Sequence, residues 1–102
     1  MSITDNAKAY HEKMFPGQQS ALAQTDPEFI ERFDNFAFDE VVNQGDLDDR
    51  TRMMAILATL LGCQGIDEFK VMLPAALNLG VTPVEAKEIV YQAAAYLSLI
   101  HI

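Results

Sequence analysis

The chain has 102 residues, half of them hydrophobic, with a mean hydropathy of +0.06. These values predict one packed domain covering residues 1–102 rather than a disordered chain. Fifteen acidic residues against seven basic ones give a formal charge of -8, so nucleic acid and anionic membranes are not expected partners. No apolar run reaches the about 20 residues that span a bilayer, and no signal-peptide core begins the chain, so we expect a cytoplasmic protein.

The N-terminal half carries two main helical patterns. Thr4 or Asp5 can cap a first helix over residues 5–15, which Pro16 and Gly17 end. Residues 18–24 predict a short helical turn. Asp26 and Pro27 then begin a long helix that runs to Gln44, with Gly45 as its C-cap.

Four of the six phenylalanines fall within residues 29–38. Their helical spacing favours a stripe that packs into the core, although such a stripe could also line a pocket. His11 lies on the first predicted helix, and we expect it at the surface.

Three further helices are predicted over residues 48–61, 67–79 and from 83 to at least 97. The segment 53–61 is apolar on every face except at Thr59, so its helix must be surrounded. Because a chain of this length buries only about two thirds of its surface, the covering surface is expected to come from a second subunit. Pro74 predicts a kink in the second of these helices, and Thr82 with Glu85 forms a capping box before the third.

The single cysteine, Cys63, excludes an internal disulfide and a two-cysteine redox pair. We expect it to act as a small buried hydrophobic side chain, with a reactive thiol as the alternative. No HxxxH or HExxH spacing, glycine-rich phosphate loop or carboxylate-histidine cluster occurs, so neither a metal nor a nucleotide cofactor is expected.

Three stretches carry a family resemblance: Arg-Thr-Arg at 50–52, Asp-Glu-Phe-Lys at 67–70, and Ala-Ala-Leu-Asn-Leu-Gly-Val-Thr at 75–82, which leads into the helix restart at Glu85. They resemble the carboxymuconolactone decarboxylase family over about half of the chain. The resemblance implies an all-α fold built on a helical hairpin, assembled as a homotrimer or homohexamer. It also implies loss of carbon dioxide from a small carboxylated lactone in aromatic-acid breakdown, without a cofactor.

A related branch, the alkyl hydroperoxide reductase D-like proteins, reduces peroxides with a CxxC pair and a histidine. By resemblance these three residues would fall on Gly65, Glu68 and Met72, so the dithiol chemistry is missing. A peroxidase activity of another type is the remaining alternative in that branch.

The resemblance to the decarboxylase branch makes Glu68 the candidate catalytic proton donor, with Arg50 or Arg52 binding the substrate carboxylate. A carboxyl group beside Phe69 in an apolar pocket could donate a proton to carbon. The alternatives are an exposed first-turn charge for Glu68 and surface pairs with neighbouring aspartates for both arginines. The second functional hypothesis is therefore a non-catalytic, oligomeric binding or scaffold protein.

Family members continue past the last predicted helix into a further helix, whereas this sequence ends at residues 97–102. Those six residues read like a translated library adapter. We therefore expect them to be a non-native tail that replaces the natural C-terminal helix.

Overall fold

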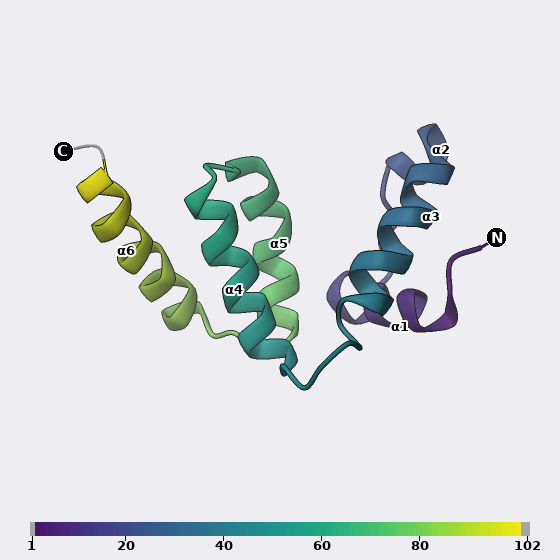
Figure 1. The fold of residues 1–102 in the computed structure, drawn as a ribbon, viewed down its shortest axis with the longest axis horizontal. Helices are drawn as coiled ribbons and strands as arrows, with labels where there is room; N and C mark the ends of the chain where they lie inside the picture. The colour runs from purple at the N-terminus through teal and green to yellow at the C-terminus, as the bar shows by residue number, and fades with distance from the viewer. Residues whose placement is uncertain (1, 101–102) are drawn as a thin grey trace. The chain divides into compact units, whose positions relative to one another are not determined.

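The computed structural model describes residues 2–100, and every regular element in that range is helical (Figure 1). The prediction of an all-α fold is confirmed. No helix within this range is long and apolar enough to cross a membrane. The elements are α1 (Asp5–Met14), α2 (Leu22–Thr25), α3 (Pro27–Asn35), the π-helix η1 (Phe36–Glu40), α4 (Asp49–Gly62), α5 (Ile66–Asn78) and α6 (Pro83–Ile100).

The helices form two compact units. The first unit, Met1–Leu47, holds α1, α2, α3 and η1, and the second unit, Asp48–Ile102, holds α4, α5 and α6. Each unit has its own buried residues, which are described separately below.

Side-chain caps begin α1, α3 and α4, and Thr82 caps α6. Thr4 Oγ1 accepts from the backbone N–H of Ala7 at 3.1 Å, which starts α1. Asp26 caps α3 through the N–H of Phe29 at 3.2 Å, and Asp48 caps α4 through the N–H of Thr51 at 3.2 Å. Each cap satisfies a backbone donor that the first helical turn leaves without a partner.

The core of the first unit lies between α1 and α3. Its buried side chains are Ala7, Tyr10 and Met14 of α1 and Ile30 of α3. Three of the four phenylalanines in the predicted stripe are about half exposed, namely Phe29, Phe33 and Phe36. The prediction that this stripe packs into the core is therefore wrong for these residues, because α1 and α2, which pack against α3, leave part of its surface uncovered.

The helix predicted from Pro27 to Gln44 changes type before it ends. At Phe36 the α-helical pattern gives way to η1, in which the N–H of Val41 bonds to the carbonyl of Phe36 at 2.8 Å. Regular helix stops at Glu40, ahead of the predicted cap at Gly45. Each hydrogen-bonded turn of a π-helix contains one residue more than a turn of an α-helix. The α-helical spacing of apolar residues does not predict this change.

The second unit is built on an antiparallel hairpin of α4 and α5, with α6 packed against α4 (Figure 1). Met53 and Leu57 of α4 are buried, together with Ala75 and Ala76 of α5, Val81 of the connection and Ala86 of α6. Other positions of the apolar segment 53–61, including Ala55 and Ala58, are exposed in the chain. One face of α4 is thus covered within the unit, and a second subunit covering the remainder stays a prediction.

Two features of the second unit depend on proline and glycine. Helix α5 runs from Ile66 to Asn78 as one helix that includes Pro74, and it begins after Gly65 without a side-chain cap, rather than at Asp67. Gly80 closes α5 with φ +105°, a conformation that residues with a Cβ atom rarely adopt.

Candidate functional site

Arg50 and Glu85 join the first turns of α4 and α6. Arg50 Nε donates to Glu85 Oε1 at 3.3 Å, and the Nη2 group forms an ion pair with Oε2. The same carboxylate accepts from the backbone N–H of Thr82 at 2.9 Å, while Thr82 Oγ1 accepts from the N–H of Glu85 at 3.1 Å. The predicted capping box is therefore present, and Arg50 pairs with it rather than with a neighbouring aspartate.

Arg52 is buried, with 9% of its surface exposed, next to the buried Met53 on α4. Arg52 does not have the expected surface position, because α4 turns it toward the interior of the unit. An arginine that is largely shielded from water binds a carboxylate more strongly than an exposed one does.

Glu68 is exposed in the first turn of α5. Its Oε2 atom lies 3.2 Å from the position that a Cβ on Gly65 would take, and Leu60 Cδ2 lies 3.5 Å from that position. The carboxylate thus folds back toward the α4–α5 turn. A carboxylate at a helix N-terminus is favoured by the helix dipole, which accounts for this position without a catalytic role.

The structure of one chain keeps Glu68 apart from the two arginines. Glu68 lies beside the turn near Leu60, whereas Arg50 and Arg52 lie in the first turn of α4. Ten residues of helix separate Arg50 from Leu60, which is about 15 Å along the axis. Helix geometry therefore places the backbones of Arg50 and Glu68 toward opposite ends of the α4–α5 hairpin.

Cys63 is exposed, in the turn that follows α4. Its Sγ atom lies 3.5 Å from the carbonyl oxygen of Leu60. The expectation of a buried thiol is wrong, because Cys63 is the C-cap residue of α4 and is exposed in the turn that follows.

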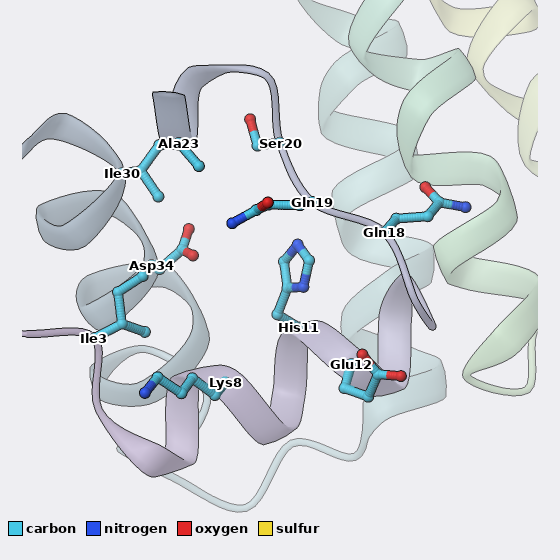
Figure 2. Close-up of a pocket in the computed structure, with 10 residues that line it drawn as sticks. All are labelled: Ile3, Lys8, His11, Glu12, Gln18, Gln19, Ser20, Ala23, Ile30 and Asp34. Atoms are coloured by element: carbon cyan, nitrogen blue, oxygen red, sulfur yellow. The ribbon is translucent and has the colours of Figure 1, made fainter. Parts of the chain in front are cut away.

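A polar pocket of about 330 Å³ lies in the first unit, between α1, α3 and the segment 18–20 (Figure 2). His11 and Asp34 both point into it, and the side chain of Gln19 extends between them. Lys8, Glu12, Gln18 and Ser20 contribute further polar groups, and Ile3, Ala23 and Ile30 supply apolar surface.

The sequence predicted a surface position for His11, but the structure shows that its side chain is half-buried. Its ring lies 5.5 Å from that of Phe15 and 5.9 Å from that of Phe38, measured between ring centroids. These contacts hold the imidazole against one wall of the pocket. The helical spacing of His11 and Phe15, four residues apart, was the available sequence signal.

Burial raises the pKa of Asp34 above its ordinary value of 3.8, and the positive charge that His11 can carry acts in the opposite direction. Sequence reasoning missed this pair because 23 residues and two turns separate its members. Among residues 2–100, no three His, Cys, Asp or Glu side chains gather as a metal site would require.

Comparison with known families decides the identity of the fold. The profile of the Carboxymuconolactone decarboxylase family matches residues 27–100, which is most of the chain. The chain belongs to the carboxymuconolactone decarboxylase family. No curated protein and no solved structure gives a significant match.

The match to the carboxymuconolactone decarboxylase family includes the whole second unit as far as Ile100, and α3 and η1 of the first. Arg50, Arg52 and Glu68 therefore lie within the family region. Most residues of the His11 pocket precede residue 27 and lie outside it.

Proposed function

We propose that the protein is a homo-oligomeric decarboxylase that acts without a cofactor on a small carboxylated lactone, at a site completed between two copies of the chain. The observation that carries the proposal is the family match over residues 27–100, which includes Arg50, Arg52 and Glu68. In one chain the two arginines and Glu68 lie toward opposite ends of the α4–α5 hairpin. Because one chain holds the proton donor and the carboxylate binders apart, a second copy is needed to bring them together.

Uncovered apolar surface on the second unit supports association with a second copy. A groove of about 360 Å³ separates α4 from the later turns of α6 and is lined mainly by Ala58, Ile89, Ala93, Tyr96 and Leu97. Its walls are almost entirely apolar. An apolar groove of this kind gains free energy when another apolar surface displaces its water.

The proposed decarboxylation requires two things of the protein: a group that binds the substrate carboxylate and a group that donates a proton to carbon. Arg52 or Arg50 binds the substrate carboxylate, the carbon-carbon bond breaks, and its electron pair moves into the conjugated carbonyl system as carbon dioxide leaves. Glu68 then gives a proton to the ring carbon and recovers one from water. Donors that stabilise the transient enolate lower the barrier most, which favours a guanidinium near the carbonyl.

The second candidate function is a non-catalytic scaffold or binding protein. It is favoured by the contact between Arg50 and Glu85, which occupies the guanidinium in holding two helices together. In that case Arg50 is a structural residue, and Glu68 is an exposed helix charge.

Turnover of carboxymuconolactone by the purified protein tests the proposal. Glu68→Gln should abolish decarboxylation and leave the oligomer intact, because the amide keeps the shape but transfers no proton. Asp67→Asn, at the adjacent exposed carboxylate of the same helix turn, is the matched control and should keep full activity. Full activity of Glu68→Gln would eliminate Glu68 as the proton donor, and no turnover by the unmodified protein would favour the scaffold function.

Sedimentation tests the assembly separately. We expect a trimer or hexamer, and Tyr96→Asp should weaken it by placing a charge in the groove. Tyr91→Asp is the control, because Tyr91 is on the same helix with nearly the same exposure, 64% against 63%, but does not line the groove. A monomeric unmodified protein, or equal effects of both variants, would remove this part of the proposal.

A further inference from the structure

The pocket of the first unit contains a partly buried carboxylate, Asp34, whose negative charge is opposed only by the charge that His11 can carry. Asp34 is partly withdrawn from water, and the influences on its pKa are burial and the charge of His11, with no hydrogen bond contributing. The second carboxylate of the pocket is already occupied, since Glu12 Oε1 and Oε2 accept from the N–H of Gly17 at 3.1 and 3.3 Å. Asp34 is therefore the acidic group available to a ligand.

The charge around the pocket favours a cation. Residues 2–47 contain nine acidic and three basic residues, a formal charge of -6 with histidine neutral. Lys8 is the single basic side chain that lines the pocket besides His11. A site surrounded by an excess of negative charge concentrates small cations and repels anions.

The remaining lining suits an organic cation rather than a bare metal ion. The side-chain oxygen of Gln19 can accept hydrogen bonds, and Ser20 Oγ, which accepts from the N–H of Leu22 at 3.2 Å, has a second lone pair. Ala23 and Ile30 offer apolar surface beside Ser20 (Figure 2). A primary ammonium group has three donors to share among such acceptors, and its carbon chain can lie along the apolar wall. The volume of about 330 Å³ is at the small end of the range for ligand pockets.

We propose that this pocket binds a small molecule with a primary ammonium group, for which Asp34 is the counter-ion and Gln19 and Ser20 are hydrogen-bond acceptors. This site is separate from the proposed decarboxylase site, since it lies in the first unit and mostly before residue 27. Lys8 also lines the pocket and could pair with a carboxylate on the same ligand. The ligand is therefore either a simple amine or an amino acid.

Nuclear magnetic resonance titration of the full-length labelled chain tests the proposal with three probes of similar size. These are propylammonium, β-alanine and the neutral control 1-propanol. We expect saturable shifts in the amides of residues 8–34 with propylammonium, β-alanine or both, and none with 1-propanol. Tighter binding of propylammonium would identify the ligand as a simple amine, and tighter binding of β-alanine would identify it as an amino acid.

Two variants locate the site. Asp34→Asn should weaken binding of the charged probes by about tenfold or more, whereas Glu31→Gln should change it less than about twofold. Glu31 lies on the same helix and its substitution changes the net charge equally, but it does not line the pocket. Ala23→Phe, which fills the pocket without altering its charge, should also abolish binding.

Equal weakening in Asp34→Asn and Glu31→Gln would overturn the proposal, because it would assign binding to the general negative field. Binding of 1-propanol as tight as that of propylammonium, or no saturable shift with either charged probe, would also overturn it. Circular dichroism of each variant confirms that the helices are intact before binding is compared.

Discussion

Arg50 and Glu85, 35 residues apart in the sequence, connect the points where α4 and α6 begin. The carboxylate of Glu85 accepts a hydrogen bond from the backbone N–H of Thr82, which caps α6, and also pairs with the guanidinium of Arg50 on α4. A substitution at either residue therefore affects both the start of α6 and its attachment to α4. This arrangement gives Arg50 a structural role that holds whether or not the protein is an enzyme.

We predict a measurable coupling free energy between these two residues. A double-mutant cycle with Arg50→Ala and Glu85→Gln, followed by urea unfolding, should give about 0.5–1 kcal/mol, because the pair is partly shielded and its geometry is fixed by the cap. The control pair is Arg32 and Glu28, which are 3.3 Å apart but 68% and 79% exposed. Its coupling should be smaller, and a value equal to that of Arg50 and Glu85 would contradict the prediction.

Gly80→Ala should destabilise the protein by about 1 kcal/mol or more, since φ +105° is strained for any residue with a Cβ atom. The added methyl group would also lie 3.8 Å from Cβ of Arg50, an ordinary contact, so strain rather than a clash is the cause. Gly62→Ala is the matched control. Gly62 ends α4 in open space, so the substitution there should be neutral or stabilising.

Stability should depend on pH through Asp34 in a predictable direction. Because burial raises its pKa, the folded protein favours the protonated form, and the associated stability is present below 3.8 and lost as the pH rises through the raised value. Asp34→Asn should therefore be more stable than the unmodified protein at neutral pH, with the difference vanishing below about pH 3.8. Thermal unfolding at a series of pH values measures this, and a difference that grows toward acid would contradict it.

Asp39 should show the opposite dependence. Hydrogen bonds from Thr4, Asn43 and Asn6, in that order, lower its pKa. The stability it contributes is present above the ordinary value of 3.8 and is lost as the pH falls through the lowered value. In Asp39→Ala the free energy of unfolding should therefore fall less between neutral and acid pH than in the unmodified protein. The same series of thermal unfolding experiments measures this.

Cys63 should react with a thiol reagent in the folded protein, because its side chain is exposed. Catalytic turnover of an organic hydroperoxide should nevertheless be absent, since no second cysteine exists to complete a dithiol cycle. Labelling with an aromatic disulfide reagent and a peroxide-consumption assay measure the two properties. Hydroperoxide turnover that disappears in Cys63→Ser would reveal a one-cysteine peroxidase that uses an outside thiol.

The sequence predicted the helices of the second unit to within one or two residues, because local chemistry marks their ends. The capping box at Thr82 and Glu85 and the aspartate cap at Asp48 are such signals, and each appears in the structure as a hydrogen bond. The family followed from the same region. Signals of this kind act over three or four residues and are visible in one sequence.

Burial was harder to predict than helix ends. Phe33 and Phe36 have the spacing of core residues but are exposed, whereas Arg52 is buried and His11 half-buried. Spacing identifies the residues that share a face of a helix, but the neighbouring element decides whether that face is covered. The pocket at His11 and Asp34 depends on two helices meeting across a turn, a tertiary event with no local signature.

The π-helical turn at Phe36–Glu40 makes the His11 pocket sensitive to chain length. A straight α-helix would need one residue fewer to cover the same span, and removing one residue would turn those that follow by about 100° about the axis. Phe38, which stacks on Tyr10 at 6.3 Å and lies beside His11, would leave both. A natural relative that lacks one residue here should therefore have lost the ring contact that supports His11, even if every side chain that lines the pocket were unchanged.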